Sequence, residues 1–441
     1  MNDKWYKTLA LAFMLSVIGK HIYAQQSVEK VITVDELFKM VKDNHPTLKP
    51  LKVDIDIAKQ NLAVAKNDFL PDISTGIQAY YLGNTNLIEK DFSGSTKVNN
   101  PNFGNKFFID AQQVIWKGNS IRNNIQSKAL IEQLTKLNYT ANEQNIKLLS
   151  IGYYLDLYKF LNQENVYRKN IELAKQRLEN INKFYNQGMV TRNDVVRGEL
   201  QLSNLKLDLQ VLLNDRQIIN RELTTALGLS AKTVIMPDTT LVNQVVNVTD
   251  FGYYEDISKR HPTLEMARKN VDVYVLSTKI TKAEMLPTLR AFAGNNLQRP
   301  LSGGTSPGID LYTHTWSAGL SLNFNIDALY KAPKKIRLNN LEKERAIAES
   351  YQNEQMINVE VNSAYIKFNE AKFQNSTLEV NTKLTEENYR IMESKYNNQL
   401  AILLDLIDAS NAKLEAELQF ANSEINIIYT YYKLLKEAGQ L

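Results

Sequence analysis

The 441-residue sequence contains no cysteine, only four histidines, and few prolines and glycines. Without cysteine the chain cannot form disulfides, bind a metal through thiolates, use a cysteine nucleophile or carry a lipid on an N-terminal cysteine. The histidines are not spaced as metal ligands are in motifs such as H-E-x-x-H. We therefore expect no catalytic site, no metal site and no cofactor.

The sequence also lacks a dominant charge and long apolar runs. It holds 52 basic and 48 acidic residues, for a formal net charge of +4. Removing residues 1–24 takes away Lys4, Lys7, Lys20 and Asp3 and leaves 49 basic and 47 acidic residues. A chain so close to neutral has no electrostatic attraction for nucleic acid. Beyond the N-terminus, no segment has the roughly 18 consecutive apolar residues of a transmembrane helix.

The N-terminus has the organisation of a signal peptide. Two lysines precede the apolar stretch 8–18, which is too short to span a bilayer. Ala24 supplies the small residue that precedes a cleavage site, so we predict a signal peptide over 1–24 and a mature chain over 25–441. The alternative is an N-terminal anchor or a buried helix, but the polar residues after Ala24 favour export.

Two parts of the chain carry the same signals in the same order. Residues 45–48 (His-Pro-Thr-Leu) recur 216 positions later at 261–264, and the Leu-Pro pair at 70–71 recurs at the same offset. Three further residues recur at an offset of 211: Tyr185 as Tyr396, Asn186 as Asn397 and Asp194 as Asp405. A period this long exceeds that of short solenoid repeats. We therefore expect two structural repeats, about 30–230 and 250–441.

Each expected repeat contains two segments that alternate with a period of two, near 72–116 and 288–326. The clearest has apolar residues at every second position: Trp316, Ala318, Leu320, Leu322 and Phe324. The positions between them are polar or glycine. Strands of about ten residues with one apolar and one polar face are typical of a membrane barrel with a wet lumen. Four strands cannot close a barrel, and an open edge cannot lie in lipid, so the pattern also predicts oligomerisation.

The rest of each expected repeat predicts helices of unusual length. Residues 120–186 contain no proline, and 67 helical residues span on the order of 100 Å. Apolar residues three and four positions apart indicate coiled-coil packing. Each long helix is followed by a predicted hairpin tip, at 186–194 and 397–405. Gly188 is a natural turn residue, and Asn193 or Asp194 is expected to cap the returning helix.

The sequence resembles the TolC-type outer-membrane efflux family in four features. These are the repeated His-Pro and Leu-Pro pairs, the two strands per repeat, the long helices and the tip sequence Asp405-Leu406-Ile407-Asp408-Ala409. The resemblance covers essentially all of residues 30–441. It implies an α+β membrane protein, a homotrimer whose four strands per chain complete a twelve-stranded β-barrel in the Gram-negative outer membrane. Long antiparallel helices would form an α-barrel in the periplasm.

The resemblance also implies a function and partners. The protein would be the exit duct of a tripartite efflux pump or of a type I secretion system. A periplasmic adaptor protein would join it to an inner-membrane pump of the resistance-nodulation-division or ABC type, and its barrel would contact outer-membrane lipid.

A periplasmic gate is implied at the hairpin tips. Asp405 and Asp408 match two acidic rings, and Tyr396 and Asp194 match a link between hairpins. Ala401 stands where the family has an arginine, and Gln399 where it has the glycine that Gly188 supplies in the first tip. Arg192 is a candidate replacement for that arginine. The simpler interpretation is a helix cap for Asp194 and solvated first-turn residues for Asp405 and Asp408.

Two other classes of protein are compatible with parts of the pattern. A secreted periplasmic coiled-coil structural or adaptor protein explains export and the helices, but not the alternating strands at the same place in both repeats. A general porin needs many more than four strands per chain.

Overall fold

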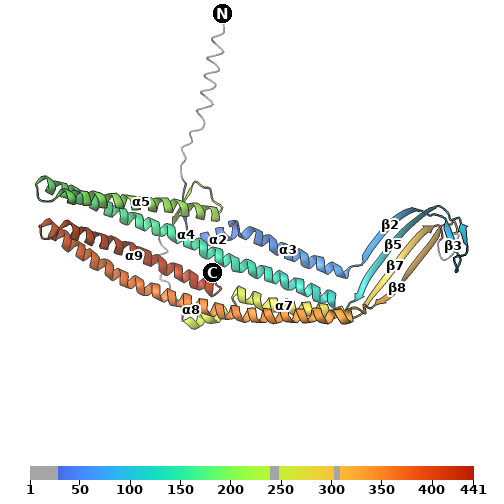
Figure 1. The fold of residues 1–441 in the computed structure, drawn as a ribbon. Helices are drawn as coiled ribbons and strands as arrows, with labels where there is room; N and C mark the ends of the chain where they lie inside the picture. The colour runs from blue at the N-terminus through green and yellow to red at the C-terminus, as the bar shows by residue number, and fades with distance from the viewer. Residues whose placement is uncertain (1–27, 239–247, 302–307) are drawn as a thin grey trace, which may run out of the picture. The chain divides into compact units, whose positions relative to one another are not determined.

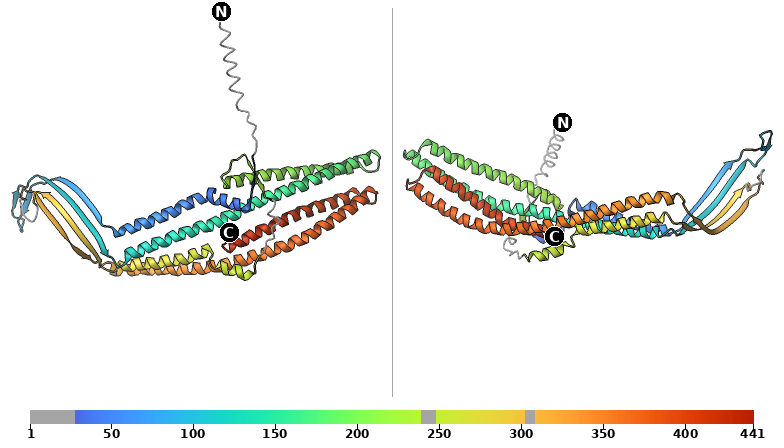
Figure 2. Two further views of the ribbon diagram at one scale, coloured as in Figure 1. Left: turned by 180° about the vertical axis from the view of Figure 1, so that it is seen from behind. Right: turned by 60° about the horizontal axis from the view of Figure 1, so that its bottom comes forward.

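A computed structural model describes residues 28–238, 248–301 and 308–441 (Figures 1 and 2). The predicted signal peptide lies outside these residues. The chain divides into two units. The first comprises Met1–Leu51, Tyr139–Pro262 and Gln355–Leu441, and the second comprises Lys52–Asn138 and Thr263–Glu354. Among the described helices, none combines the length and the apolar character needed to cross a membrane.

The second unit contains a four-stranded antiparallel sheet in the order β2-β5-β7-β8 (Figure 1). These strands are β2 (Asp72–Tyr81), β5 (Phe103–Trp116), β7 (Thr288–Arg299) and β8 (Thr313–Asn323). They lie within the two segments in which alternation predicts strands. Strand β5 comes from the first expected repeat and β7 from the second. These two strands pair directly, so one sheet contains the strands of both repeats.

Where β7 pairs with β8 near residues 320–322, the strand register places leucines on one face of the sheet and polar side chains on the other. Leu320 pairs with Ala291 and Leu322 with Leu289, whereas Ser321 pairs with Arg290. Residues directly opposite in antiparallel strands project to the same side. Leu320 and Leu322 are 66% and 68% exposed, so the apolar face is not covered within this chain. On the other face the ring of Phe108 lies against Gly76, where an added Cβ would stand 2.7 Å from it.

Helices α3 (Leu48–Lys66) and α7 (Pro262–Ala283) precede β2 and β7, and a short 3-10 turn, η1 (Asn67–Phe69), follows α3. The prediction of four strands that contribute to one sheet is confirmed, but the chain has further short strands outside that sheet. A hairpin of β3 (Thr85–Ile88) and β4 (Ser95–Val98) occupies a stretch where only a polar loop is expected.

The first unit contains two long helical hairpins (Figures 1 and 2). In the first hairpin α4 (Ser120–Asn186) is followed by α5 (Arg192–Ala226), and in the second α8 (Ala328–Asn397) is followed by α9 (Leu403–Glu437). The prediction of a helix over 120–186 is confirmed. The N-terminal parts of α4 (up to Asn138) and of α8 (up to Glu354) belong to the second unit.

A small parallel sheet and two short helices complete the first unit. Strands β1 (Val28–Ile32) and β6 (Thr233–Pro237) form the sheet, and the helices are α2 (Val34–Asn44) and α6 (Phe251–Ser258). The buried Tyr154 hydroxyl donates to the Ile32 carbonyl oxygen at 2.7 Å and accepts from the Asp238 amide at 2.8 Å. Tyr154 therefore ties this sheet to α4. The surrounding core contains Leu37, Val41, Leu48, Ile151, Leu155, Leu157, Leu223, Leu227, Ile235, Ile425 and Ile428.

Candidate functional site

The first hairpin tip is a glycine-terminated helix end. The Met189 amide donates to the Phe184 carbonyl oxygen, and the Gly188 amide donates to the Tyr185 carbonyl oxygen, each at 2.9 Å. This pair of bonds is the Schellman pattern, which requires a left-handed residue after the helix. Gly188 provides it with φ +72°, and nothing lies within 4 Å of where its Cβ would be.

The second tip has the same backbone hydrogen bonds without glycine. The Leu400 amide donates to the Lys395 carbonyl oxygen at 2.8 Å, and the Gln399 amide donates to the Tyr396 carbonyl oxygen at 3.0 Å. Gln399 holds φ at +61°. A left-handed backbone costs an ordinary L-residue about 1–2 kcal/mol. The second tip therefore keeps the turn at an energetic cost that the first tip does not have.

The returning helix α5 begins with a capping box. The Thr191 Oγ1 accepts from the Asp194 amide at 3.3 Å, and the Asp194 Oδ2 accepts from the Thr191 amide at 2.8 Å and from its hydroxyl at 2.7 Å. The predicted cap at Asn193 or Asp194 is wrong, because Thr191 is the N-cap and Asp194 is the third residue of the helix. The box pairs the Thr191 amide and adds a second acceptor for the Asp194 amide, which also donates to the Thr191 carbonyl oxygen at 3.1 Å.

Helix α9 has only half of this arrangement. The Asp405 Oδ2 accepts from the Ile402 amide at 3.3 Å, but the isoleucine side chain offers no oxygen in return. Asp405 and Asp408 are exposed and lie three residues apart, so both carboxylates project from one face of α9. Their convergence on copies from other chains remains a prediction.

Tyr396 is buried between the two hairpins. Its ring packs edge-on against Phe184 with centroids 6.3 Å apart, within an apolar cluster of Ile181, Val195, Tyr389, Leu403 and Leu406. Burial raises the pKa of the Tyr396 hydroxyl, and the negative charge of Asp194 raises it further while Arg177 opposes the shift. The hydroxyl has no hydrogen-bond partner in the described residues. Tyr396 and Asp194 therefore interact only electrostatically, and the predicted link between them is not a hydrogen bond.

Arg192, the candidate replacement for the missing arginine, points along its own helix. It lies 3.8 Å from Glu199 in an exposed ion pair on α5. This ion pair lies within one helix, so it does not join the two hairpins as predicted for Arg192.

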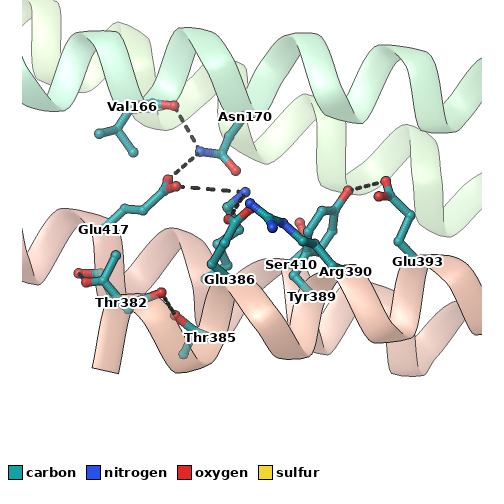
Figure 3. A network of polar contacts seen from close by, with 12 residues as sticks. Val166, Asn170, Thr382, Thr385, Glu386, Tyr389, Arg390, Glu393, Ser410 and Glu417 are labelled. Atoms are coloured by element: carbon teal, nitrogen blue, oxygen red, sulfur yellow. Dashed lines mark hydrogen bonds and ion pairs between the residues drawn. The ribbon is translucent and has the colours of Figure 1, made fainter. Parts of the chain in front are cut away.

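The side chain that does join the hairpins is Arg177, which the sequence reasoning missed. Arg177 is only 8% exposed on α4, and its Nη2 donates to the Tyr389 hydroxyl at 3.2 Å and to the Ser410 Oγ at 3.1 Å. Its Nη1 donates to Gln201 Oε1 at 2.9 Å on α5. The Tyr389 hydroxyl in turn donates to Glu393 at 2.7 Å (Figure 3). One guanidinium group on α4 therefore contacts side chains of α5, α8 and α9.

A second buried cation, Lys413, lies near the same ring. Its Nζ is 4.8 Å from the Tyr389 ring centroid, and the Arg177 guanidinium carbon is 5.6 Å from it. Lys413 forms an ion pair with Glu386, and its hydrogen bond holds the pKa of that carboxyl below its ordinary value despite partial burial. Asn170 on α4 donates to Glu417 at 3.2 Å, which extends the network between hairpins (Figure 3).

A signal for both cations was present in the sequence. Arg177 lies three residues after Ala174 and four before Ile181, on the apolar seam of α4, and Lys413 lies between Ala409 and Ala416 on α9. A charged residue on an apolar seam predicts a buried, paired group. The partners were not predictable from that spacing, and two partners of Arg177, Tyr389 and Ser410, lie more than 200 residues away in the sequence.

Comparison with known proteins gives both a sequence match and a fold match. Residues 253–439 match the family model described as outer membrane efflux protein. The outer membrane efflux protein BepC of Brucella suis biovar 1 (strain 1330) is 21% identical over 439 residues, which cover 98% of this chain and 90% of that protein.

The solved structures have the same fold at low sequence identity. The CmeC outer membrane channel of Campylobacter jejuni superimposes with a TM-score of 0.74 at 14% identity, covering 92% of this chain and 85% of that one. The outer membrane protein VceC of Vibrio cholerae gives a TM-score of 0.76 at 13% identity, covering 92% and 96%. The later part of the chain is therefore similar in sequence to outer membrane efflux proteins, and the chain has the fold of outer-membrane channels.

Proposed function

We propose that this protein is the outer-membrane exit duct of a tripartite efflux pump or type I secretion system, and that it acts as a homotrimer. The observation that carries the proposal is the two-faced sheet. Its apolar face is uncovered in the chain, and its outer strands, β2 and β8, have no further strand beside them in the described residues. An unpaired edge is not tolerated in lipid, so these edges require strands from other copies.

Three copies with four sheet strands each supply twelve strands for one closed barrel. The long hairpins of three chains supply a helical tube on the periplasmic side. The equivalent order of strands and hairpins supports two structural repeats, about 30–230 and 250–441. BepC, CmeC and VceC carry names that refer to the outer membrane or to efflux, which favours this function over a secreted coiled-coil protein.

The experiment that tests the duct is insertion of two neighbouring charge variants. Leu320→Arg places a charge on the apolar face, where it costs about 2–4 kcal/mol near the bilayer midplane, while Ser321→Arg places it on the polar face. We expect Leu320→Arg to reduce the yield of membrane-extracted trimer and Ser321→Arg to keep it. Equal yields from the two variants, or a stable monomer of wild type in membranes by native mass measurement, would contradict the proposal.

We propose that the hairpin tips form the gate, with Asp405 and Asp408 of three chains facing a narrow opening. Six converging carboxylates repel one another and bind polyvalent cations. We expect such cations, added on the periplasmic side of a planar bilayer, to block conductance. Asp405→Ala with Asp408→Ala should weaken that block. The matched control is Asp208→Ala with Asp215→Ala, which removes two exposed carboxylates of α5 away from the tip. Unchanged block in the Asp405 and Asp408 variant returns both residues to the role of solvated first-turn residues.

A passive duct does not itself hydrolyse a nucleotide, so the proposed function requires partner proteins that supply the energy for transport. We propose a periplasmic adaptor that contacts the helix tips and an inner-membrane pump of the resistance-nodulation-division or ABC type. Met189, Leu400 and Ile402 present apolar side chains at the tips, with exposed fractions of 46%, 77% and 63%. Exposed apolar residues of this kind are available to contact a partner protein.

A further inference from the structure

A pocket with a volume of about 670 Å³ lies in the first unit between α5 and the residues that lead into β6. Three of its lining side chains are cationic, namely Arg216, Arg221 and Lys232, and none of them is acidic. Volumes of this size accommodate a small ligand. The neutral overall charge of the protein makes this local excess of positive charge a specific feature of the pocket.

Arg216 is only partly neutralised. Its Nη1 lies 2.9 Å from Glu164 Oε2, but the Glu164 Oε1 is also bound by Arg168 at 2.7 Å. One carboxylate therefore serves two guanidinium groups. The Arg216 Nη2 donates to the Met236 sulfur at 3.7 Å, and a thioether is a weak acceptor. A stronger acceptor would improve this contact.

Arg221 and Lys232 are exposed, and in the described part of the chain neither charged group has an ion pair or a hydrogen-bond partner. Their separation is set by Asn220. The Asn220 Nδ2 donates to the Thr233 carbonyl oxygen, and its Oδ1 accepts from the Ile235 amide, each at 2.8 Å. This pair of bonds fixes the backbone of β6 against α5. The backbone positions of Arg221 and of Lys232, the residue before β6, are therefore set before a ligand arrives.

We propose that this pocket binds an oxyanion ligand that carries at least two phosphate or carboxylate groups. A guanidinium group presents paired N–H donors that match the oxygens of either group, and an ammonium adds a point charge. Because Arg221 and Lys232 are exposed, each separate ion pair is worth little in water, and a ligand must engage several cations together. The site is distinct from the hairpin tips and does not depend on the gate.

Calorimetry on the full-length protein in a zwitterionic detergent tests the proposal. The probes are inorganic pyrophosphate and citrate at matched ionic strength, which separate a phosphate from a carboxylate ligand. We expect saturable binding of at least one probe, with a dissociation constant below about 1 mM. The variant Arg221→Gln with Lys232→Gln should weaken this binding at least tenfold.

The control variant also removes two positive charges, but from positions on α5 outside the pocket. Arg197→Gln with Lys206→Gln changes two exposed residues that do not line the pocket, and it should leave binding unchanged. Equal weakening by both double variants would show a non-specific charge effect and overturn the proposal. So would the absence of saturable heat from both probes up to about 10 mM, which is weaker than any specific site of this charge should be.

Discussion

The two helical hairpins of the first unit have the same backbone design and different side-chain chemistry. Gly188 and Gln399, 211 positions apart, both take the left-handed turn, and Asp194 and Asp405 both satisfy an amide at the start of the returning helix. The first tip uses glycine and a threonine cap, and the second uses Gln399 and Ile402. The shape of the second tip therefore has weaker local support, and packing between the hairpins must supply the rest.

The largest expected effect comes from removing the cation that joins the hairpins. Arg177→Met keeps an aliphatic side chain but leaves Gln201, Tyr389 and Ser410 without their shared donor. Buried polar groups that lose a partner cost about 1–3 kcal/mol each, so we expect a loss of at least about 2 kcal/mol. Amide hydrogen exchange in residues 385–397 should accelerate at least tenfold.

The control for Arg177 is its counterpart 211 positions later. Asn388 is exposed on α8, and Asn388→Ala should leave exchange nearly unchanged. If the two variants accelerate exchange equally, Arg177 contributes no more than a surface residue, and the hairpins are held by their apolar contacts alone.

A smaller effect is expected from exchanging the two turn residues. Gly188→Gln places an L-residue in the left-handed region and should destabilise the first tip by about 1–2 kcal/mol. No steric clash adds to this cost, because no neighbouring atom lies within 4 Å of the added Cβ. Gln399→Gly should stabilise the second tip by a similar or smaller amount. Exchange at the Met189 and Leu400 amides measures each tip separately. Shifts of the same sign in both variants would contradict the strain assigned to Gln399.

The smallest expected effect concerns the helix starts. Thr191→Ala removes the hydroxyl that accepts from the Asp194 amide and should cost about 1 kcal/mol. Ile402→Thr introduces the same hydroxyl in front of Asp405 and should stabilise the start of α9 by about 0.5 kcal/mol. The measurement is protection of the Asp194 and Asp405 amides. A loss of protection at Asp405 in Ile402→Thr would mean that the isoleucine has a packing role that its 63% exposure does not suggest.

Local sequence rules predicted the parts of the fold that depend on local interactions. The absence of proline over 120–186 predicted α4, and alternation predicted the strands near 288–326. The Thr191 cap was also accessible, because Thr-Arg-Asn-Asp has the spacing of a capping box. The five-residue strands β1 and β6 were not predictable, since so short a segment has little periodicity and they pair across 200 residues.

The candidate site was predictable in position and not in contacts. The tips lie where Gly188 and the offset of 211 place them. The bonds between hairpins depend instead on which side chains meet across 212 and 233 residues, as Arg177 meets Tyr389 and Ser410. No local pattern contains that information, so the predicted link through Tyr396 and Asp194 missed the hydrogen bonds that Arg177 makes.

The buried hydroxyl of Tyr396 is an energetically unfavourable feature of the packed hairpins. The group has given up water without gaining a protein partner, which costs about 1–3 kcal/mol. Any movement that brings it to water or to the Asp194 carboxylate recovers that free energy. A recovery of this size changes the ratio of two conformations by roughly 5- to 150-fold. If the tips open as proposed, exposing this one hydroxyl to water would lower the free energy of the open conformation by that amount.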